Sequence, residues 1–111
     1  MSNVFARRRM HAQPDKNQRA IIERLAKEIP EATVLVVNGD FDLLIGYRGV
    51  NLMYEVKNPE SKKSKTEHRL KPKQIWLRDH WRGQYRIVSS YEEILNDLGR
   101  VTIDMIARIA G

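Results

Sequence analysis

The sequence predicts a single-domain α/β fold in which a mixed β-sheet is flanked by helices, with the element order αβββαβα. A length of 111 residues allows one hydrophobic core but not two. Three short apolar segments, rich in β-branched and aromatic residues, follow one another between turn signals. Segments with apolar residues at helical spacing precede and follow them, which favours one sheet covered by helices.

The first half of the chain is expected to supply a helix and three strands. A flexible basic arm is predicted at residues 1–14, and the folded domain at residues 15–111. A helix should run from Asp15, a suitable N-cap, to Ile29, where Pro30 stops it. Strands are expected at 32–37, 41–47 and 51–56, with Asn38-Gly39 and Arg48-Gly49 as the turns of an antiparallel meander.

The second half is expected to complete the layers around the sheet. A long basic loop covers residues 57–71. The predicted elements after it are a helix from Pro72 to Trp81, a strand from Gln84 to Ser89, a helix that Ser90 caps and Gly99 ends, and a last helix from Thr102 to Ala110.

Composition narrows the class of protein and of partner. The absence of cysteine excludes disulfides and thiolate zinc sites and suits a reducing compartment, so a cytoplasmic location is expected. No segment is apolar enough to cross a membrane, and no membrane partner is expected. The formal net charge of +6 favours a polyanion such as DNA, although such charge can also be plain solvated surface. The residues expected to contact DNA are Lys62, Lys63, Lys65, Arg69, Lys71 and Lys73.

Two carboxylates and an ammonium group are expected to converge on one patch of the sheet. Glu55 and Lys57 project from the same face of one strand because side chains alternate along it. Asp42 lies on the preceding strand, and positions 42 and 55 are roughly symmetric about the turn at Arg48-Gly49, so Asp42 and Glu55 should be neighbours.

This grouping suits phosphodiester hydrolysis. Oxygen ligands from Asp42 and Glu55 can hold Mg²⁺ or Mn²⁺, which would polarise a phosphate and activate an attacking water. Lys57 could orient or deprotonate that water, or stabilise the transition state, and the sequence does not choose between these roles. The competing interpretation is a set of surface charges paired across the sheet.

Several motifs in order resemble the PD-(D/E)XK nucleases, and more closely the small stand-alone VRR-NUC proteins common in phages. The motifs are Asn17-Gln18, the block from Asp42 to Gly49, Glu55-Val56-Lys57, Leu70-Lys71-Pro72-Lys73-Gln74, Trp81-Arg82-Gly83 and the segment from Ser89 to Ile94. Two positions depart from the family pattern, because Phe41 replaces the proline before the first catalytic aspartate and Lys71 replaces a common threonine.

The resemblance implies a restriction-endonuclease-like fold and a metal-dependent deoxyribonuclease. It implies that Asp42, Glu55 and the Val56 backbone carbonyl bind the metal, and that Gln74 faces the same site. If the protein is encoded by a phage, its location is the cytoplasm of the host cell. The family includes enzymes that process branched DNA and junctions, for which a homodimer would offer two sites.

The resemblance also implies that the first helix contributes a side chain to the site, and helical geometry favours Gln18 over Glu23 for this position. Gln18 lies on the apolar stripe with Ile22 and Leu25, whereas Glu23 should point to solvent. A glutamine that only satisfies backbone groups at the helix start is the equal alternative for Gln18. An exposed helix residue is the weaker alternative for Gln74.

Three further points complete the expectations. Trp76 and Trp81 are expected to pack at least half-buried, with stacking on unpaired bases as the alternative. Residues 101–110 form an apolar segment that could serve as a dimer surface or pack on its own core. The predicted function is a DNA endonuclease, with a non-catalytic nucleic-acid-binding protein of the same fold, or an assembly protein, as the competing classes.

Overall fold

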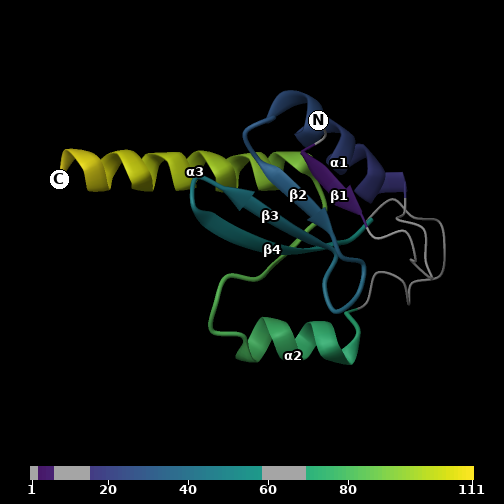
Figure 1. The fold of residues 1–111 in the computed structure, drawn as a ribbon. Coiled ribbons are helices and arrows are strands. Elements are labelled where there is room, and N and C mark those ends of the chain that lie inside the picture. Colours follow the sequence, from purple (N-terminus) through teal and green to yellow (C-terminus); the bar gives the residue numbers. More distant parts are fainter. Residues whose placement is uncertain (1–2, 7–15, 59–69) are drawn as a thin grey trace.

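The computed structural model describes residues 3–6, 16–58 and 70–111, and in these ranges it shows a five-stranded sheet with three helices (Figure 1). The elements are β1 (Val4–Ala6), α1 (Lys16–Glu28), β2 (Thr33–Val36), β3 (Leu43–Tyr47), β4 (Val50–Val56), α2 (Pro72–His80), β5 (Arg86–Val88) and α3 (Tyr91–Ala110). The predicted α/β single domain with a mixed sheet is confirmed. None of the described helices is both long and apolar enough to span a bilayer.

The strands lie in the order β1-β2-β3-β4-β5, so neighbours in the sheet are also consecutive in the sequence. The pairs β2–β3 and β3–β4 are antiparallel, which confirms the predicted meander. The two edge strands, β1 and β5, each pair in parallel with their neighbour. The parallel β4–β5 pair matters for the site, because it fixes which face of the sheet each β5 residue occupies.

A two-residue turn joins β3 to β4 and sets the register of that hairpin. Tyr47 pairs with Val50, and both intervening residues, Arg48 (φ 50°) and Gly49 (φ 78°), have left-handed backbone. Two successive positive φ values are the signature of a type I′ turn, whose twist matches that of the strands it joins. From this turn the ladder runs without interruption to Leu43 and Tyr54.

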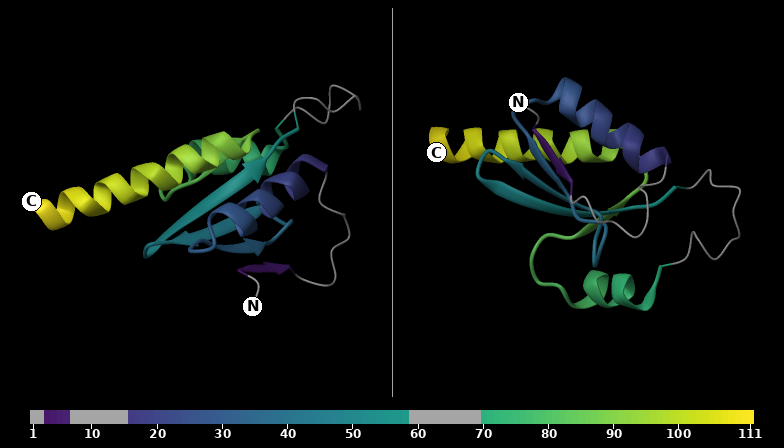
Figure 2. Two further views of the ribbon diagram at one scale, coloured as in Figure 1. Left: turned by 90° about the horizontal axis from the view of Figure 1, so that it is seen from above. Right: turned by 45° about the vertical axis from the view of Figure 1, so that its right-hand side comes forward.

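The helices divide between the two faces of the sheet, with α1 and α3 on one face and α2 on the other (Figures 1 and 2). Most of the hydrophobic core lies beneath α1 and α3, and Leu52, Tyr54 and Val56 of β4 belong to it. Since side chains alternate along a strand, Met53 and Glu55 face α2 instead. Both faces of β4 are therefore buried.

The N-terminal segment corrects one prediction. Val4–Ala6 was assigned to a flexible arm, yet it forms the edge strand β1. The Asn3 side chain secures it by donating to the carbonyl of Ala32 at 2.9 Å, and the Val34 N–H donates to the carbonyl of Asn3 at 2.7 Å. Sequence patterning misses so short a strand because three residues show no periodicity. The remainder of the arm, residues 7–15, lies outside the described residues.

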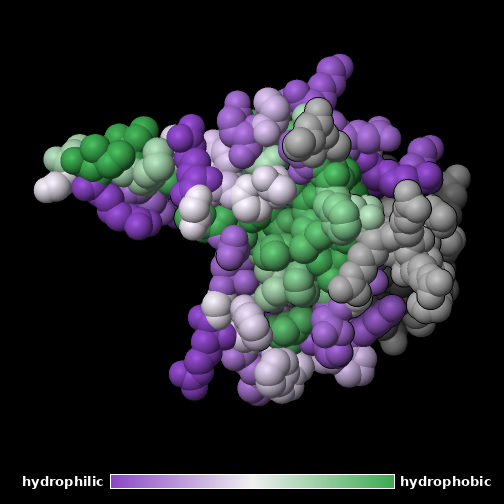
Figure 3. Space-filling view, viewed as in Figure 1, coloured by the Kyte–Doolittle hydropathy of each residue, from purple (hydrophilic) through white to green (hydrophobic). Residues whose placement is uncertain are grey.

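The C-terminal part corrects a second prediction, because α3 continues through Gly99 instead of ending there. Its N-terminus is as expected, with the Ser90 hydroxyl accepting from the Glu93 N–H at 3.3 Å. The second half of α3 runs past the sheet (Figure 1) and ends in a hydrophobic tip (Figure 3). Ile103, Ile106 and Ile109 are exposed there.

Replacing Gly99 by alanine tests the continuous helix. Gly99 has helical backbone, and an added Cβ would meet no atom within 4 Å. Alanine should therefore raise the free energy of unfolding by about 0.5–1 kcal/mol. A helix that ended at Gly99 in left-handed conformation would give the opposite sign. Gly49→Ala is the matched control, and it should destabilise because Gly49 has φ +78°. Chemical denaturation of the three proteins measures both differences.

Candidate active site

Asp42 and Glu55 are neighbours, as predicted from their symmetry about the hairpin turn. The ladder pair Leu43–Tyr54 ends one residue short of them, and the Asp42 N–H extends it by donating to the Tyr54 carbonyl at 3.0 Å. The Asp42 carboxylate Oδ2 accepts from the Val56 N–H at 2.8 Å. This bond fixes the carboxylate of Asp42 against the end of β4, next to Glu55.

Glu55 is buried beneath α2, with 6% of its surface exposed. Its Oε1 accepts a hydrogen bond from Nε2 of Gln74, which is itself buried at the first turn of α2. The Gln74 Oε1 accepts from the Lys71 N–H at 2.9 Å, so both ends of the amide are bonded and its orientation is defined. Gln74 thus caps its own helix and holds one oxygen of Glu55 at the same time.

Burial is the largest influence on the ionisation of Glu55 and raises its pKa to about 9. The adjacent Asp42 carboxyl adds to the rise, while the positive charges of Lys57 and Lys71 oppose it. Around neutral pH, without a cation, the Glu55 carboxyl therefore keeps its proton. Its second oxygen, Oε2, is buried and accepts no hydrogen bond from a described donor, whereas the protonated carboxyl can donate to the adjacent Asp42 carboxylate.

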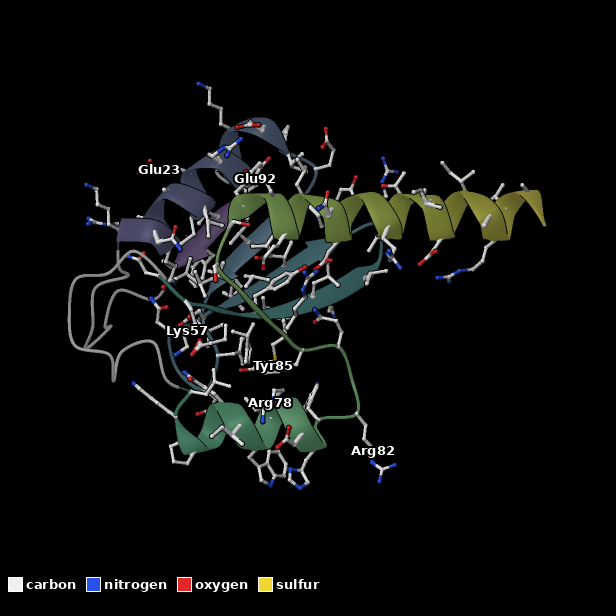
Figure 4. All side chains as sticks on the ribbon, turned by 180° about the vertical axis from the view of Figure 1, so that it is seen from behind. Glu23, Lys57, Arg78, Arg82, Tyr85 and Glu92 are labelled. Atoms are coloured by element: carbon white, nitrogen blue, oxygen red, sulfur yellow. The ribbon has the colours of Figure 1, made fainter. Side chains whose placement is uncertain are left out.

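Lys57 follows β4 and lies on the same side of the sheet as α2 (Figure 4). Its backbone is held on both sides, because its N–H donates to the Val88 carbonyl at 2.8 Å and its carbonyl accepts from Asn17 Nδ2 at 2.9 Å. The same Asn17 amide also donates to the Ser89 carbonyl at 3.0 Å. Asn17 of α1 therefore ties together the ends of β4 and β5. The structure thus brings Asp42, Glu55, Lys57 and Gln74 together.

Gln18 is buried, as its place on the apolar stripe of α1 predicts, but it lies on the other side of the sheet from α2. It donates to the Asn38 side-chain Oδ1 at 2.6 Å, and the Asn38 N–H donates to the Asp42 carbonyl at 3.2 Å. Gln18 therefore contacts the loop that positions Asp42, and a catalytic role for it stays a prediction. Glu23 is exposed on α1, as predicted, and lies away from the site (Figure 4).

Sequence reasoning missed one residue of the site, Tyr85, which lies between the sheet and α2 (Figure 4). Its hydroxyl is buried and lacks a hydrogen-bond partner among the described residues. Burial raises the pKa of Tyr85 to about 12, and the charges of Glu55 and Asp42 contribute to this rise. No sequence signal marks this tyrosine, because its side of the sheet depends on the pairing of β5 with β4.

The two tryptophans are about half-buried, which is the outer limit of the predicted packing. Trp76 is 55% exposed and Trp81 is 49% exposed. The Trp76 ring stacks on that of His80, with centroids 5.2 Å apart. Trp76 and His80 lie on the outer side of α2 because the buried side of this short helix is taken by Gln74 and Leu77.

Only part of the predicted DNA-contacting group can be placed. Lys62, Lys63, Lys65 and Arg69 lie outside the described residues. Lys71 and Lys73 are exposed at the start of α2, and Lys73 Nζ forms an ion pair with Asp40 Oδ1 at 2.5 Å. Because both partners of that pair are largely exposed, a phosphate can compete with Asp40 for the lysine.

The donor set fits a hard divalent cation. A buried carboxyl oxygen without a donor, next to a second carboxylate, supplies the oxygen ligands that Mg²⁺ and Mn²⁺ prefer. No group of three or more histidine, cysteine or acidic side chains with metal-binding geometry occurs in the described ranges. Two carboxylates are compatible with Mg²⁺, which usually retains several waters. The Val56 peptide lies against Asp42, and metal coordination by its carbonyl stays a prediction.

Comparisons with models of protein families, with functionally characterised proteins and with solved structures found no match. The resemblance to PD-(D/E)XK nucleases therefore stays a prediction from the motifs. The functional proposal is therefore based on the arrangement of Asp42, Glu55 and Lys57.

The raised pKa of Glu55 predicts how stability depends on pH. Its folded-state pKa of about 9 exceeds the ordinary value of 4.5, so between them the folded protein binds more protons than the unfolded chain. The stability contribution of Glu55 is complete below about pH 4.5 and is lost as pH rises towards about 9. Glu55→Gln cannot titrate and should become progressively more stable than the wild-type protein over that window. Thermal unfolding in EDTA measures the difference.

Glu23→Gln is the control for this measurement, because Glu23 is exposed on α1 and outside the site. It should follow the wild-type protein at every pH. A difference between wild type and Glu55→Gln that does not change with pH would contradict the assignment of a buried, protonated carboxyl.

Proposed function

We propose that the protein is a divalent-metal-dependent endonuclease that hydrolyses phosphodiester bonds in DNA. The observation that carries the proposal is the buried carboxyl of Glu55 beside Asp42, with Lys57 following on the same face. Burying a carboxyl next to another is unfavourable unless a proton or a cation neutralises the pair. Such perturbed groups are concentrated at functional sites.

The net positive charge of the chain supports a polyanionic substrate. The formal net charge is +6, and Lys71 and Lys73 are exposed at the end of α2 that faces the carboxylates. A protein that only bound nucleic acid would gain nothing from two acids beside a phosphate. A divalent cation on the two carboxylates would neutralise them, so that the positive charges of the nearby lysines dominate and attract phosphate.

Each residue of the site has a role consistent with its contacts. Asp42 and Glu55 would hold Mg²⁺ or Mn²⁺, which when bound polarises the phosphate and lowers the pKa of the attacking water. Gln74 holds Oε1 of Glu55, which leaves Oε2 for the cation. Lys57 neutralises charge that develops on the phosphate, or positions the attacking water. Asn17 keeps the backbone of Lys57 in place.

The finer assignments belong to the same proposal. A restriction-endonuclease-like fold agrees with a mixed sheet whose central hairpin carries the acids. Branched or junction DNA is the proposed substrate class, because the family that the motifs resemble includes enzymes that process such DNA. A homodimer would present two sites to two strands, and the exposed isoleucines of α3 offer one surface for it. A cytoplasmic location remains an expectation from the cysteine-free sequence.

Cleavage assays test the proposal. The wild-type protein should cut at least one of linear duplex, single-stranded and four-way-junction DNA with Mg²⁺ or Mn²⁺, and should cut none in EDTA. Asp42→Asn and Glu55→Gln should each reduce cleavage by at least about 10²-fold, because each removes a ligand charge. Glu23→Gln, the exposed control, should retain full activity.

Binding that persists without cleavage in any metal would contradict the enzyme and favour the non-catalytic nucleic-acid-binding protein. Cleavage that survives in the double variant Glu55→Ala, Lys57→Ala would show that the site has been misplaced.

The exposed rings of α2 predict a preference for unpaired bases. Trp76 and Trp81 are about half exposed, and Arg82, which follows Trp81, extends into solvent (Figure 4). Stacking on one base contributes about 1–3 kcal/mol. Trp76→Ala should therefore weaken binding of single-stranded DNA about tenfold and binding of blunt duplex much less. Fluorescence anisotropy in EDTA measures both affinities.

Ile75→Ala is the matched control, because Ile75 is a neighbouring exposed side chain on α2 without an aromatic ring. It should leave both affinities unchanged. Equal losses on single-stranded and duplex DNA for Trp76→Ala would contradict base stacking.

A further inference from the structure

Tyr85 faces the same side of the sheet as Glu55. The parallel ladder pairs Tyr54 with Arg86 and Glu55 with Ile87. Arg86 points to the α3 side, where its guanidinium forms an ion pair with Asp97. Since neighbouring side chains alternate, Tyr85 points to the α2 side, as Figure 4 shows. The bond from the Met53 N–H to the Gln84 side chain holds this segment against β4.

The Tyr85 hydroxyl is buried without a hydrogen-bond partner among the described residues, and Glu55 Oε2 is buried without a described donor. They share one face of the sheet beneath α2, yet neither bonds to the other. An unsatisfied buried hydroxyl destabilises a fold, so native proteins rarely keep one without a use. The hydroxyl of Tyr85 is thus a free donor next to the carboxylates.

We infer that Tyr85 is a further catalytic residue, whose hydroxyl donates a hydrogen bond to a non-bridging oxygen of the phosphodiester held at Asp42 and Glu55. This inference rests on the proposed nuclease function. The proton stays on the tyrosine throughout, and no bond to Tyr85 forms or breaks. The hydrogen bond strengthens as negative charge grows on the phosphate oxygens, so it favours the transition state over the bound substrate.

Two properties make Tyr85 a donor and not a base. The ordinary pKa of a tyrosine, about 10, already keeps the hydroxyl protonated at neutral pH, and burial shifts this pKa further in the same direction. It also directly precedes the short strand β5, whose backbone is paired to β4, and the Gln84 side chain before it is bonded to the Met53 N–H, so its direction is fixed before substrate arrives. A preorganised donor needs no rearrangement during the reaction, which is where its catalytic effect originates.

Tyr91 provides a matched control for an experiment on Tyr85. Its hydroxyl is also buried, and it lies near the Glu28 carboxylate of α1. Tyr91 belongs to the core beneath α1 and α3, on the opposite face from the carboxylates. Both substitutions, Tyr85→Phe and Tyr91→Phe, remove a buried hydroxyl, but only the Tyr85 hydroxyl shares a face of the sheet with the carboxylates.

The experiment compares Tyr85→Phe and Tyr91→Phe with the wild-type protein on the DNA substrate that it cuts best, with Mn²⁺. Tyr85→Phe should lower kcat about 10²-fold with little change in KM, because it removes a transition-state donor. Its thermal unfolding temperature should equal or exceed that of the wild type, since an unsatisfied buried hydroxyl is lost. Tyr91→Phe should leave kcat and KM unchanged.

Three outcomes would overturn the inference, and they are distinguishable. If the wild-type protein and Tyr91→Phe cut DNA and Tyr85→Phe keeps kcat within about twofold, Tyr85 is not catalytic while the nuclease function stands. If Tyr85→Phe loses activity together with a lowered unfolding temperature, its role is structural. If neither wild type nor Tyr91→Phe cuts any DNA, the proposed function fails and the inference fails with it.

Discussion

The contact between Glu55 and Gln74 is the interaction on which the arrangement of the site depends. Glu55 sits on a strand that is buried on both faces, so its carboxyl has no access to bulk water to compensate for its polarity. One oxygen is satisfied by Gln74 and the other has no donor. Because the buried carboxyl is unfavourable when charged, its pKa is raised and a proton or a cation is favoured beside Asp42. The bond from Gln74 to the same carboxyl connects α2 to the sheet.

The architecture separates stability from chemistry across a single sheet. On one face, β4 contributes Leu52, Tyr54 and Val56 to the core beneath α1 and α3. On the other face, the intervening positions carry Met53 and Glu55 towards α2. The same seven-residue strand thus anchors the fold and presents the candidate site. A shift of one residue in register would exchange the core side chains of β4 with those that face α2. The turn at Arg48-Gly49, in which both residues have left-handed backbone, fixes this register.

Local sequence signals predicted those parts of the site that depend on short-range geometry. The pairing of Asp42 with Glu55 follows from a two-residue turn, and the burial of Gln18 follows from helical periodicity. The sequence did not reveal Tyr85 or β1, because parallel pairing joins segments that are distant in the chain. Gly99 was misread because a glycine signals both a helix end and a tolerated interior position. The exposure of Trp76 depended on which side of α2 meets the sheet.

Helix α2 is only weakly attached to the sheet, and its position is therefore sensitive to the state of the site. Only Gln74 and Leu77 of this helix are buried, so few apolar contacts hold it on the sheet. Its position therefore depends strongly on the bond from Gln74 to Glu55, and hence on what neutralises that carboxyl. A proton neutralises Glu55 and can be shared with Asp42, whereas a cation would bind both carboxylates as ligands and leave Oε1 of Glu55 as an acceptor for Gln74. The position of α2, which carries the exposed ring of Trp76 and begins directly after Lys71, would then depend on whether a proton or a cation is bound to the carboxylates beneath it.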